Sequence, residues 1–342
     1  MKTLRTAGGV LRSKLLGTPV PVAITLALTY RCNLRCRYCQ IWKAAGEELS
    51  TRQVLTALDE LREAGMVRLG LTGGEPLLRP DLDVIVAHAR ELGLFTTVFT
   101  NGALVDQHMP TMRRLDAVLV SLDGPREIHD EARGRGAHAA AMHAIEVLTR
   151  AGVPVWTNTV LTGRNLGAVD YVLQTARRNG ALAAFQPVFE HSYSVKGERV
   201  DELRAEEEQY QAVIDHLLDL KRRGAPLLNS TSFFDYVRTP SWERNQRSCL
   251  AGVRYGAVSP EGRVAPCPIL LQARDLPDGR AIGFAEAFRR CGRRIRCKGC
   301  FCIATVESDQ LFDLEPGAIA NTLRHMVRRE ARRLAGSFVR VP

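Results

Sequence analysis

The stretch LTYRCNLRCRYCQIW, residues 28–42, follows an apolar run and places Cys32, Cys36 and Cys39 within eight positions of one another. Thiols this dense are typical of a site for a soft metal, and the candidates are zinc and an iron-sulfur cluster. A structural zinc site wants a fourth ligand close by, and none is present. Three thiolates on a four-iron cluster leave one iron free to bind a substrate or cofactor. Three inert buried thiols, or an opportunistic metal site, are the remaining alternatives.

The composition favours a cytoplasmic protein with well-buried cores. The chain has 342 residues, 45% of them hydrophobic, which is enough for one large domain and a smaller companion. It shows no run long enough for a transmembrane segment and no signal-peptide pattern, so we expect it in the cytoplasm. Thiols stay reduced there, so the nine cysteines are expected to be metal ligands or redox groups rather than disulfides.

Basic residues exceed acidic ones, 47 against 37, and the excess is concentrated at the two ends of the chain. Residues 1–20 are predicted to be a basic arm, and residues 306–342 a basic C-terminal helix. Aromatic residues for stacking on bases are absent there, so nucleic acid is not an expected partner. The charge is interpreted as the solvated face of an amphipathic helix.

From residue 21, short apolar runs alternate with helical patterns. Ser50 is positioned to cap the first helix, and Gly65 and Gly93 follow helical segments where a left-handed cap is needed. Continuous apolarity in the runs suits strands covered on both faces. The alternation predicts an α/β fold, a partial (β/α)6 barrel similar to a TIM barrel over residues 21–228, with functional groups at the carboxyl ends of the strands. The predicted strands are 21–29, 67–73, 95–101, 117–123, 153–161 and 182–190.

The alternation ends near residue 224, and the other six cysteines fall in the stretch from Cys249 to Cys302. We call this stretch the second cysteine field. It is rich in glycine as well as cysteine. The sequence therefore predicts a second, smaller domain over residues 229–305, held together by metal rather than by a hydrophobic core.

The CxxxCxxC motif, with Tyr38 directly before its last cysteine, resembles the signature of the radical SAM superfamily. The resemblance implies that Cys32, Cys36 and Cys39 hold a 4Fe-4S cluster whose open iron binds S-adenosylmethionine. In such enzymes the reduced cluster cleaves this cofactor to methionine and a 5'-deoxyadenosyl radical.

The second predicted strand ends in TGGEP, which is similar to the GGE motif of that superfamily. The resemblance places Gly73, Gly74 and Glu75 around the methionine amino group. Glycines allow a backbone to approach a ligand closely, and a carboxylate suits an ammonium.

The ends of the later strands carry further similar segments. In SLDGPREIHDEARG the resemblance implies that Ser121 and Asp123 line the cofactor site and that Arg133 meets the methionine carboxylate, for which a guanidinium is the natural partner. An ordinary exposed helix arginine is the alternative for Arg133. Asn158 and Gln186 are expected near the ribose and adenine, although either side chain could instead satisfy a neighbouring loop backbone.

The second cysteine field resembles the SPASM and shorter twitch extensions of radical SAM enzymes. Twelve residues separate Cys249 from Gly262 and four more precede Cys267, with SPEGRV as a hairpin turn. A full SPASM domain completes two auxiliary clusters with seven ligands, whereas this field has six cysteines, so we expect one auxiliary 4Fe-4S cluster. The preferred ligands are Cys249, Cys267, Cys297 and Cys300, with Cys291 or Cys302 as possible replacements. A zinc ribbon made by these four cysteines is the alternative to an auxiliary cluster.

The resemblance implies an enzyme that abstracts hydrogen from a small-molecule or peptide substrate, supplied with electrons by a donor such as flavodoxin or ferredoxin. The auxiliary cluster would assist oxidation or position the substrate. Only 31 residues precede Cys32, so we expect a peptide to be recognised directly or through a separate carrier. The rival hypothesis is a non-catalytic iron-sulfur or zinc scaffold or electron carrier, which would not need Glu75 and Arg133. Candidates for a general base or substrate contact are Glu190, His191, Tyr193, Asp235 and Tyr236, and for His191 a structural hydrogen bond is the favoured alternative.

Overall fold

The computed structural model describes residues 18–188, 203–238, 249–292, 301–325 and 327. Six parallel strands form the body of one sheet, and each pairs with its neighbours in sequence order. Each lies within one of the six predicted runs, so the strand predictions are confirmed. The strands are β1 (Ala23–Ala27), β2 (Arg68–Thr72), β3 (Phe95–Thr100), β4 (Ala117–Ser121), β5 (Val155–Leu161) and β6 (Leu182–Pro187).

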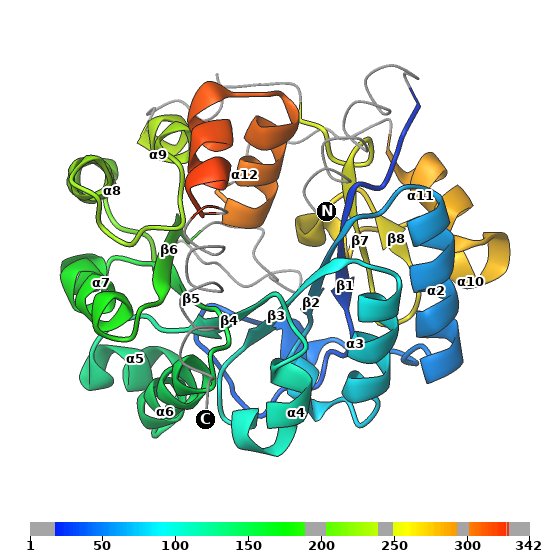
Figure 1. The fold of residues 1–342 in the computed structure, drawn as a ribbon, viewed down its shortest axis with the longest axis horizontal. Coiled ribbons are helices and arrows are strands. Elements are labelled where there is room, and N and C mark those ends of the chain that lie inside the picture. The colour runs from blue at the N-terminus through cyan, green and yellow to red at the C-terminus, as the bar shows by residue number, and fades with distance from the viewer. Residues whose placement is uncertain (1–17, 189–202, 239–248, 293–300, 326, 328–342) are drawn as a thin grey trace, which may run out of the picture.

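Helices cover the outer side of the curved sheet, as Figure 1 shows. Ser50 caps the first of them as expected, because its hydroxyl accepts from the backbone N–H of Gln53 at 3.3 Å. Gly65 and Gly93 have φ values of +117° and +71°, so both provide the left-handed backbone predicted after the helices. The helices are α2 (Thr51–Glu63), α3 (Leu82–Glu91), α4 (Met109–Met112), α5 (Arg126–Arg133), α6 (Ala137–Arg150) and α7 (Val169–Arg178), with 3-10 turns η1 (Ile41–Lys43), η2 (Pro76–Leu78), η3 (Val105–His108) and η4 (Leu166–Ala168).

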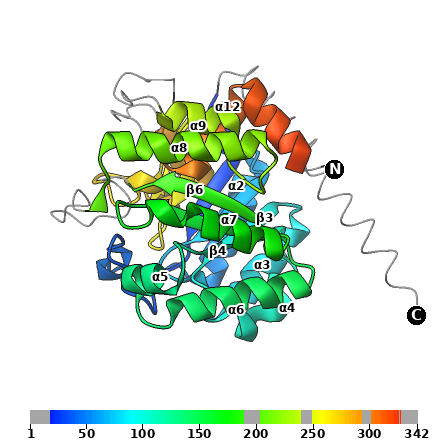
Figure 2. The ribbon, with the colours of Figure 1, turned by 90° about the vertical axis from the view of Figure 1, so that its left-hand side faces the viewer.

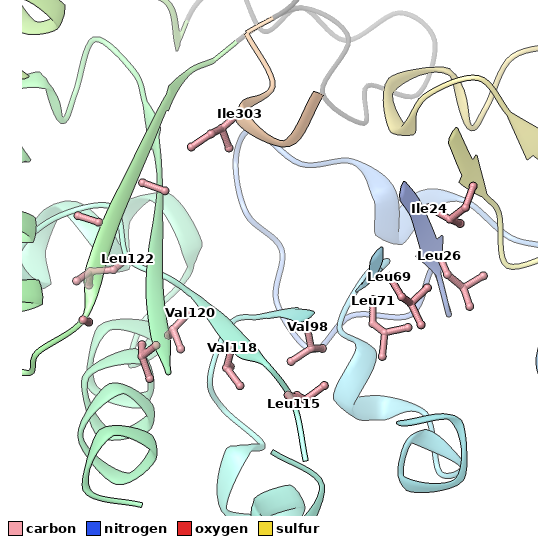
Figure 3. Close-up of a cluster of buried hydrophobic side chains, with 14 of the residues drawn as sticks. Ile24, Leu26, Leu69, Leu71, Val98, Leu115, Val118, Val120, Leu122 and Ile303 are labelled. Atoms are coloured by element: carbon pink, nitrogen blue, oxygen red, sulfur yellow. The ribbon is translucent and has the colours of Figure 1, made fainter. Parts of the chain in front are cut away.

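The two faces of the sheet differ in burial. Side chains alternate along a strand, and those on the outer face pack under the helices with 3% or less of their surface exposed. Figure 3 shows part of this cluster, including Ile24, Leu26, Leu69, Leu71, Val98, Val118 and Val120. The expectation that both faces are fully covered is wrong, because several side chains of the inner face are only half-buried, as the interior of an open barrel allows. These are Arg68, Phe95, Phe99, Trp156, Asn158 and Gln186.

Residues after 249 extend the same sheet. Strand β7 (Tyr255–Val258) runs parallel to β1 on the side away from β2, and β8 (Val264–Ala265) pairs with β7 in antiparallel fashion. Phe284 and Phe288 of α11 (Phe284–Cys291) belong to the main hydrophobic cluster. The described part of the second cysteine field therefore shares the barrel's sheet and core and is not held by metal alone. The expected domain boundaries stay a prediction.

The sheet order is β6-β5-β4-β3-β2-β1-β7-β8, which leaves β6 and β8 as the two edges. The expected α/β partial barrel is therefore confirmed. Between β6 and β7 the sequence forms α8 (Glu207–Arg222) and α9 (Thr231–Arg238), which pack together next to β6 (Figure 2). After β8 come η6 (Pro268–Leu270) and α10 (Gly279–Ile282).

Helix α12 (Ile303–Phe312) bridges the seam between the β6 side and the β7 side of the open barrel (Figure 1). Its first N–H, on Ile303, donates to Oε1 of Gln186 at 3.0 Å. Near its other end, Asp309 accepts from the N–H of Leu250 at 2.7 Å, and the Phe312 carbonyl accepts from the Arg254 guanidinium at 2.6 Å. The helix therefore joins two parts of the sheet that do not pair with each other.

The ends of the chain are described only in part. Of the expected basic arm, residues 18–20 are described. In place of a single helix from residue 306, the structure has α12 ending at Phe312 and a second helical segment over 316–325. Leu314 between them has a φ of +63°, which interrupts the helix. Among the described helices, none has the length and apolarity needed to cross a bilayer.

Candidate cofactor site

The three clustered cysteines lie on the connection from the end of β1 to α2, residues 28–50, which we call the cysteine loop. All three thiols are free and half-buried. Burial raises the pKa of each thiol, that of Cys39 to about 12, and Cys36 and Cys32 raise it further. The thiols are thus close enough to affect one another's protonation. They lie past the carboxyl end of β1, where functional groups were expected.

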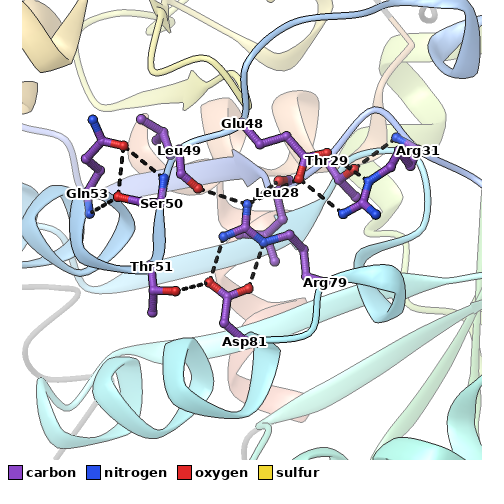
Figure 4. A network of polar contacts seen from close by, with 10 residues as sticks. All are labelled: Leu28, Thr29, Arg31, Glu48, Leu49, Ser50, Thr51, Gln53, Arg79 and Asp81. Atoms are coloured by element: carbon purple, nitrogen blue, oxygen red, sulfur yellow. Dashed lines mark hydrogen bonds and ion pairs between the residues drawn. The ribbon is translucent and has the colours of Figure 1, made fainter.

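Arg79 fastens both ends of the cysteine loop to the barrel (Figure 4). Its buried guanidinium, 4% exposed, donates to the carbonyls of Leu28 at 3.2 Å and Leu49 at 3.0 Å. It also forms a two-pronged pair with Asp81, at 2.8 and 2.7 Å, and Asp81 accepts from the Thr51 hydroxyl at 2.8 Å. The sequence reasoning missed Arg79, although it lies only three residues after the GGEP segment.

A second set of contacts acts within the loop itself. Glu48 accepts hydrogen bonds from the hydroxyl of Thr29 and, at 3.2 Å, from Nε of Arg31. Burial opposes the charge of Glu48, but these hydrogen bonds outweigh it and hold its pKa below the ordinary value. The start and end of the loop are therefore linked by a charged side chain near Arg79.

The two glycines of the TGGEP segment bring the cysteine loop against β2. The N–H groups of Gly74 and Glu75 donate to the carbonyls of Thr29 and Arg31 at 2.7 and 2.8 Å. A Cβ on Gly73 would stand 2.2 Å from the carbonyl oxygen of Thr29, and one on Gly74 would stand 2.1 Å from that of Arg31. The close approach expected of these glycines is thus made, and in this structure it is made to the backbone of the cysteine loop.

Glu75 is 1% exposed and fully held by the end of β3. Its two oxygens accept from the Thr100 hydroxyl and the Asn101 N–H, both at 2.8 Å. Burial nevertheless raises its pKa to about 7, and its charge contributes to the raised pKa of Cys32. Asn101 also donates to the Asn33 side chain in the cysteine loop at 2.7 Å. Glu75 is therefore a preorganised buried carboxyl near the thiols.

Arg133 is 7% exposed, so the alternative of an ordinary exposed arginine is wrong. Its Nε and Nη2 donate to the carboxylate of Asp123 at 2.6 and 3.4 Å, and Tyr38 donates its hydroxyl to the same carboxylate at 2.7 Å. Burial opposes ionisation of Asp123, but the Arg133 guanidinium holds its pKa below the ordinary value. The positive charge also lowers the pKa of Cys36, against the effect of burial. The pair therefore joins β4, α5 and the cysteine loop.

The remaining predicted polar contacts differ in their surroundings. Ser121 at the end of β4 lies in register with Asn158 on β5, and both are half-buried. Oδ1 of Asn158 is buried and has no hydrogen-bond partner among the described residues, as befits a group that meets a ligand. Oε1 of Gln186 already accepts from Ile303, so this oxygen satisfies a backbone group of α12. Their cofactor roles stay predictions.

In the second cysteine field, Cys249 and Cys302 each lie within electrostatic reach of Cys267. Burial raises the pKa of Cys267 to about 12, and the thiols of Cys249 and Cys302 raise it further. Cys249 contacts the Tyr255 hydroxyl at 3.1 Å. Cys291 instead donates its thiol to the Phe288 carbonyl of its own helix at 3.2 Å. Cys297 and Cys300 lie outside the described residues.

The two cysteine fields lie at opposite ends of the sheet. Tyr255 pairs in register with Ala23 at the start of β1, whereas the cysteine loop begins after Ala27 at its end. Five strand residues at roughly 3.3 Å each separate these two levels by roughly 15 Å. Sequence reasoning did not predict this, because it depends on the pairing of β7 with β1.

The arrangement of the cysteine thiols distinguishes between the two candidates, a single zinc ion and a four-iron cluster. In the described ranges, no three His, Cys, Asp or Glu side chains converge closely enough to hold a single metal ion. A four-iron cluster takes its thiolates on separate iron atoms and so needs no such convergence. The three thiols of the cysteine loop fit that group better than a mononuclear zinc ion.

Of the candidate substrate contacts, the two that the structure describes lie apart from this site. Glu190, His191 and Tyr193 lie outside the described residues. Asp235 is exposed on α9, and Tyr236 packs against the main hydrophobic cluster. That helix packs against α8 and α12, and it does not follow a strand end.

Comparisons with known proteins show the family to which this chain belongs. Residues 26–176 match the family model of the radical SAM superfamily. The chain is 32% identical over 275 residues to the mycofactocin maturase MftC of Mycobacterium ulcerans, covering 76% of this chain and 72% of that protein. The chain therefore belongs to the radical SAM superfamily and is an enzyme, which confirms the resemblance and removes the non-catalytic scaffold. Membership supports S-adenosylmethionine and a 4Fe-4S cluster as cofactors.

Within the superfamily, the chain is similar to enzymes with different substrates. It is 29% identical over 343 residues to the AdoMet-dependent heme synthase of Methanosarcina barkeri, covering 88% of this chain and 97% of that one. It is 27% identical over 346 residues to the PqqA peptide cyclase of Granulibacter bethesdensis, covering 91% and 90%. The fold is that of Streptococcus suis SuiB bound to S-adenosylmethionine, with a TM-score of 0.65 at 17% identity over 81% of this chain and 68% of that chain.

Proposed function

We propose that this enzyme holds a 4Fe-4S cluster on Cys32, Cys36 and Cys39, binds S-adenosylmethionine beside it, and acts on a peptide substrate. When bound, the reduced cluster and the cofactor supply a 5'-deoxyadenosyl radical that abstracts hydrogen from the substrate. The chain's own contribution is to hold the cofactor, to orient it toward the substrate and to exclude water.

The observation that carries this proposal is the pair of buried charged groups on either side of the cysteine loop. The methionine end of the cofactor has an ammonium and a carboxylate. Glu75 offers a preorganised carboxyl for the ammonium, and Arg133 offers a guanidinium for the carboxylate while Asp123 holds it in place. Asn158 offers a buried acceptor that nothing else uses. Such groups act strongly because burial excludes competing water.

We extend the proposal to one auxiliary 4Fe-4S cluster in the second cysteine field. Cys249 and Cys302 each lie within electrostatic reach of Cys267, and this favours Cys302 over Cys291 as a ligand. Cys297 and Cys300 complete the candidate set. A substrate between the two fields would lie in the barrel interior, where an auxiliary cluster assists oxidation or positions the substrate. An external donor such as flavodoxin or ferredoxin would supply the electrons.

A peptide is the favoured substrate because one similar protein and one similar structure are named for peptides. The relative is the PqqA peptide cyclase, and the structure is SuiB bound to its precursor peptide SuiA. A third similar protein, MftC, is named as a maturase. The second candidate is a small molecule, favoured by the heme synthase that the chain matches over 97% of that protein.

Anaerobic reconstitution tests the core of the proposal. The purified protein is loaded with iron and sulfide, reduced with dithionite and assayed for 5'-deoxyadenosine and methionine. Replacing Cys32, Cys36 and Cys39 by Ala should abolish both products. Cys291→Ala is the matched control, because that thiol bonds to its own helix. A wild-type protein that holds a full cluster and yet forms no 5'-deoxyadenosine would refute the proposed function.

A further inference from the structure

Arg68 places a positive charge on the inner face of the barrel. A side chain built at Gly70, two residues along β2, would lie 3.8 Å from Oγ1 of Thr25 on the inner side, whereas Leu69 between them packs into the outer cluster. Because side chains alternate along a strand, Arg68 shares the inner face with Gly70. Its guanidinium lies 5.3 Å from the ring centroid of Phe95, its register partner on β3.

This guanidinium has no polar partner within the described part of the chain. The Arg68 side chain forms no hydrogen bond or ion pair there, and the opposite charge that acts on it is Glu307 on α12, which forms no ion pair with it. A guanidinium carries five N–H donors. Because the Arg68 side chain is only half-buried and meets no acceptor among the described residues, these donors on β2 are accessible to a ligand.

Glu307 does not fully compensate this charge. One of its oxygens already accepts from the N–H of Ser230 at 2.6 Å, and burial raises its pKa to about 7. Near neutral pH, a substantial fraction of this carboxyl is therefore protonated and uncharged. The positive charge of Arg68 is therefore only partly balanced by Glu307.

The surroundings of Arg68 suit an organic ligand. Phe95, Phe99 and Trp156 of the inner face are all half-buried, so aromatic surface remains accessible beside the charge. Arg68 pairs with Ala23, which pairs on its other side with Tyr255, the residue that contacts Cys249. The guanidinium therefore lies level with the second cysteine field, at the end of the barrel away from the cysteine loop.

We propose that Arg68 anchors a carboxylate of the substrate in the barrel interior, at the level of the second cysteine field. The inference rests on the proposed function, because it requires the substrate to enter the barrel, and it narrows the substrate to a molecule with a carboxylate. The planar fork of arginine matches both oxygens of such a group. In a peptide, that group is an acidic side chain or the free carboxyl terminus.

Capped tripeptides separate these sources. The reconstituted holoenzyme with S-adenosylmethionine is titrated anaerobically by calorimetry with acetyl-Ala-Glu-Ala-amide, acetyl-Ala-Gln-Ala-amide and acetyl-Ala-Ala-Ala with a free carboxyl terminus. At least one of the two carboxylate peptides should bind at least about tenfold more tightly than the neutral one. Which of them does so identifies the source of the carboxylate.

Variants then assign the preference to Arg68. Arg68→Gln should reduce the ratio of the affinities for the carboxylate and neutral peptides to about one. Arg68→Lys, which keeps the charge without the planar fork, should keep only part of the preference for the carboxylate peptide. Arg62→Gln is the matched control, because Arg62 is equally half-buried but lies outside the barrel, bonded to the Leu92 carbonyl. Glu307→Gln should strengthen the preference, since it removes the competing carboxylate.

Several outcomes would overturn the inference. They are equal affinity for all three peptides, no binding of any peptide, or a preference that persists in Arg68→Gln. If Arg68 only balances Glu307, then Arg68→Gln and Glu307→Gln each lower the thermal midpoint. In that case neither variant changes the preference for the carboxylate peptides, and the inference is refuted. Formation of 5'-deoxyadenosine in the same preparation separates this inference from the proposed function: a wild-type enzyme that cleaves the cofactor but ignores the carboxylate refutes the anchor alone.

Discussion

Replacing Arg79 by Met is expected to destabilise the metal-free protein, because the guanidinium holds both ends of the cysteine loop. The substitution removes the two bonds to Asp81 and those to the carbonyls of Leu28 and Leu49, while keeping most of the side chain's volume. The Arg79 and Asp81 side chains are 5% and 15% exposed, so the loss is that of a buried pair. Breaking such a pair costs about 3 to 5 kcal/mol.

Thermal unfolding followed by circular dichroism measures this effect. For a protein of this size, a loss of about 3 to 5 kcal/mol lowers the midpoint by about 4 to 7 °C. Scans at one fixed rate keep the comparison valid if unfolding is irreversible. Arg62→Met is the control, since Arg62 is half-buried and donates one bond from Nε to the Leu92 carbonyl, worth about 1 kcal/mol. A midpoint for Arg79→Met as high as that of the control would refute the role of Arg79 in fastening the loop.

Three further predictions concern the charges and thiols. Glu75→Gln and Arg133→Lys should each weaken S-adenosylmethionine binding about tenfold, or about 1.4 kcal/mol, with the cluster spectrum unchanged; titration of the reconstituted variants checks this, and wild-type affinity in both would remove the cofactor placement. The double replacement of Cys249 and Cys267 by Ala should leave cofactor cleavage in a folded protein while reducing its iron content, and loss of all cleavage would contradict separate roles for the two fields. Metal-free Glu307→Gln should gain stability over the wild type as pH rises from about 5 to 8. The folded Glu307 carboxyl has a pKa of about 7, above its ordinary 4.5, so in the wild type it must ionise while buried over that range. If denaturant unfolding shows the same difference in stability between the two proteins at every pH, this reasoning fails.

The strands and the first metal site were predictable because their signals are local. A continuous apolar run between glycines predicts a strand from its own residues, and β4 and β5 lie within such runs. The spacing of Cys32, Cys36 and Cys39 is likewise a property of eight consecutive residues. Glu75 was identified because its motif directly follows β2.

Other features depend on partners that leave no trace in the sequence. Arg79 binds the carbonyls of Leu28 and Leu49, and every residue type offers a carbonyl. Gly73 was expected to approach a ligand, because the sequence does not show that the Thr29 backbone occupies that space. The half-buried inner face was missed because a hydrophobic run does not tell whether its second face meets helices or an open interior.

The pairing of β1 on both sides has a consequence for the newly made chain. One edge of β1 meets β2 about 45 residues later, whereas its other edge waits for β7, about 230 residues further along. Until the ribosome has produced Tyr255–Val258, that edge offers unpaired backbone groups to any other strand. Contacts so distant in sequence also form slowly. A chain truncated before Tyr255 should therefore expose β1 to aggregation, even though it contains all three cysteines of the first site.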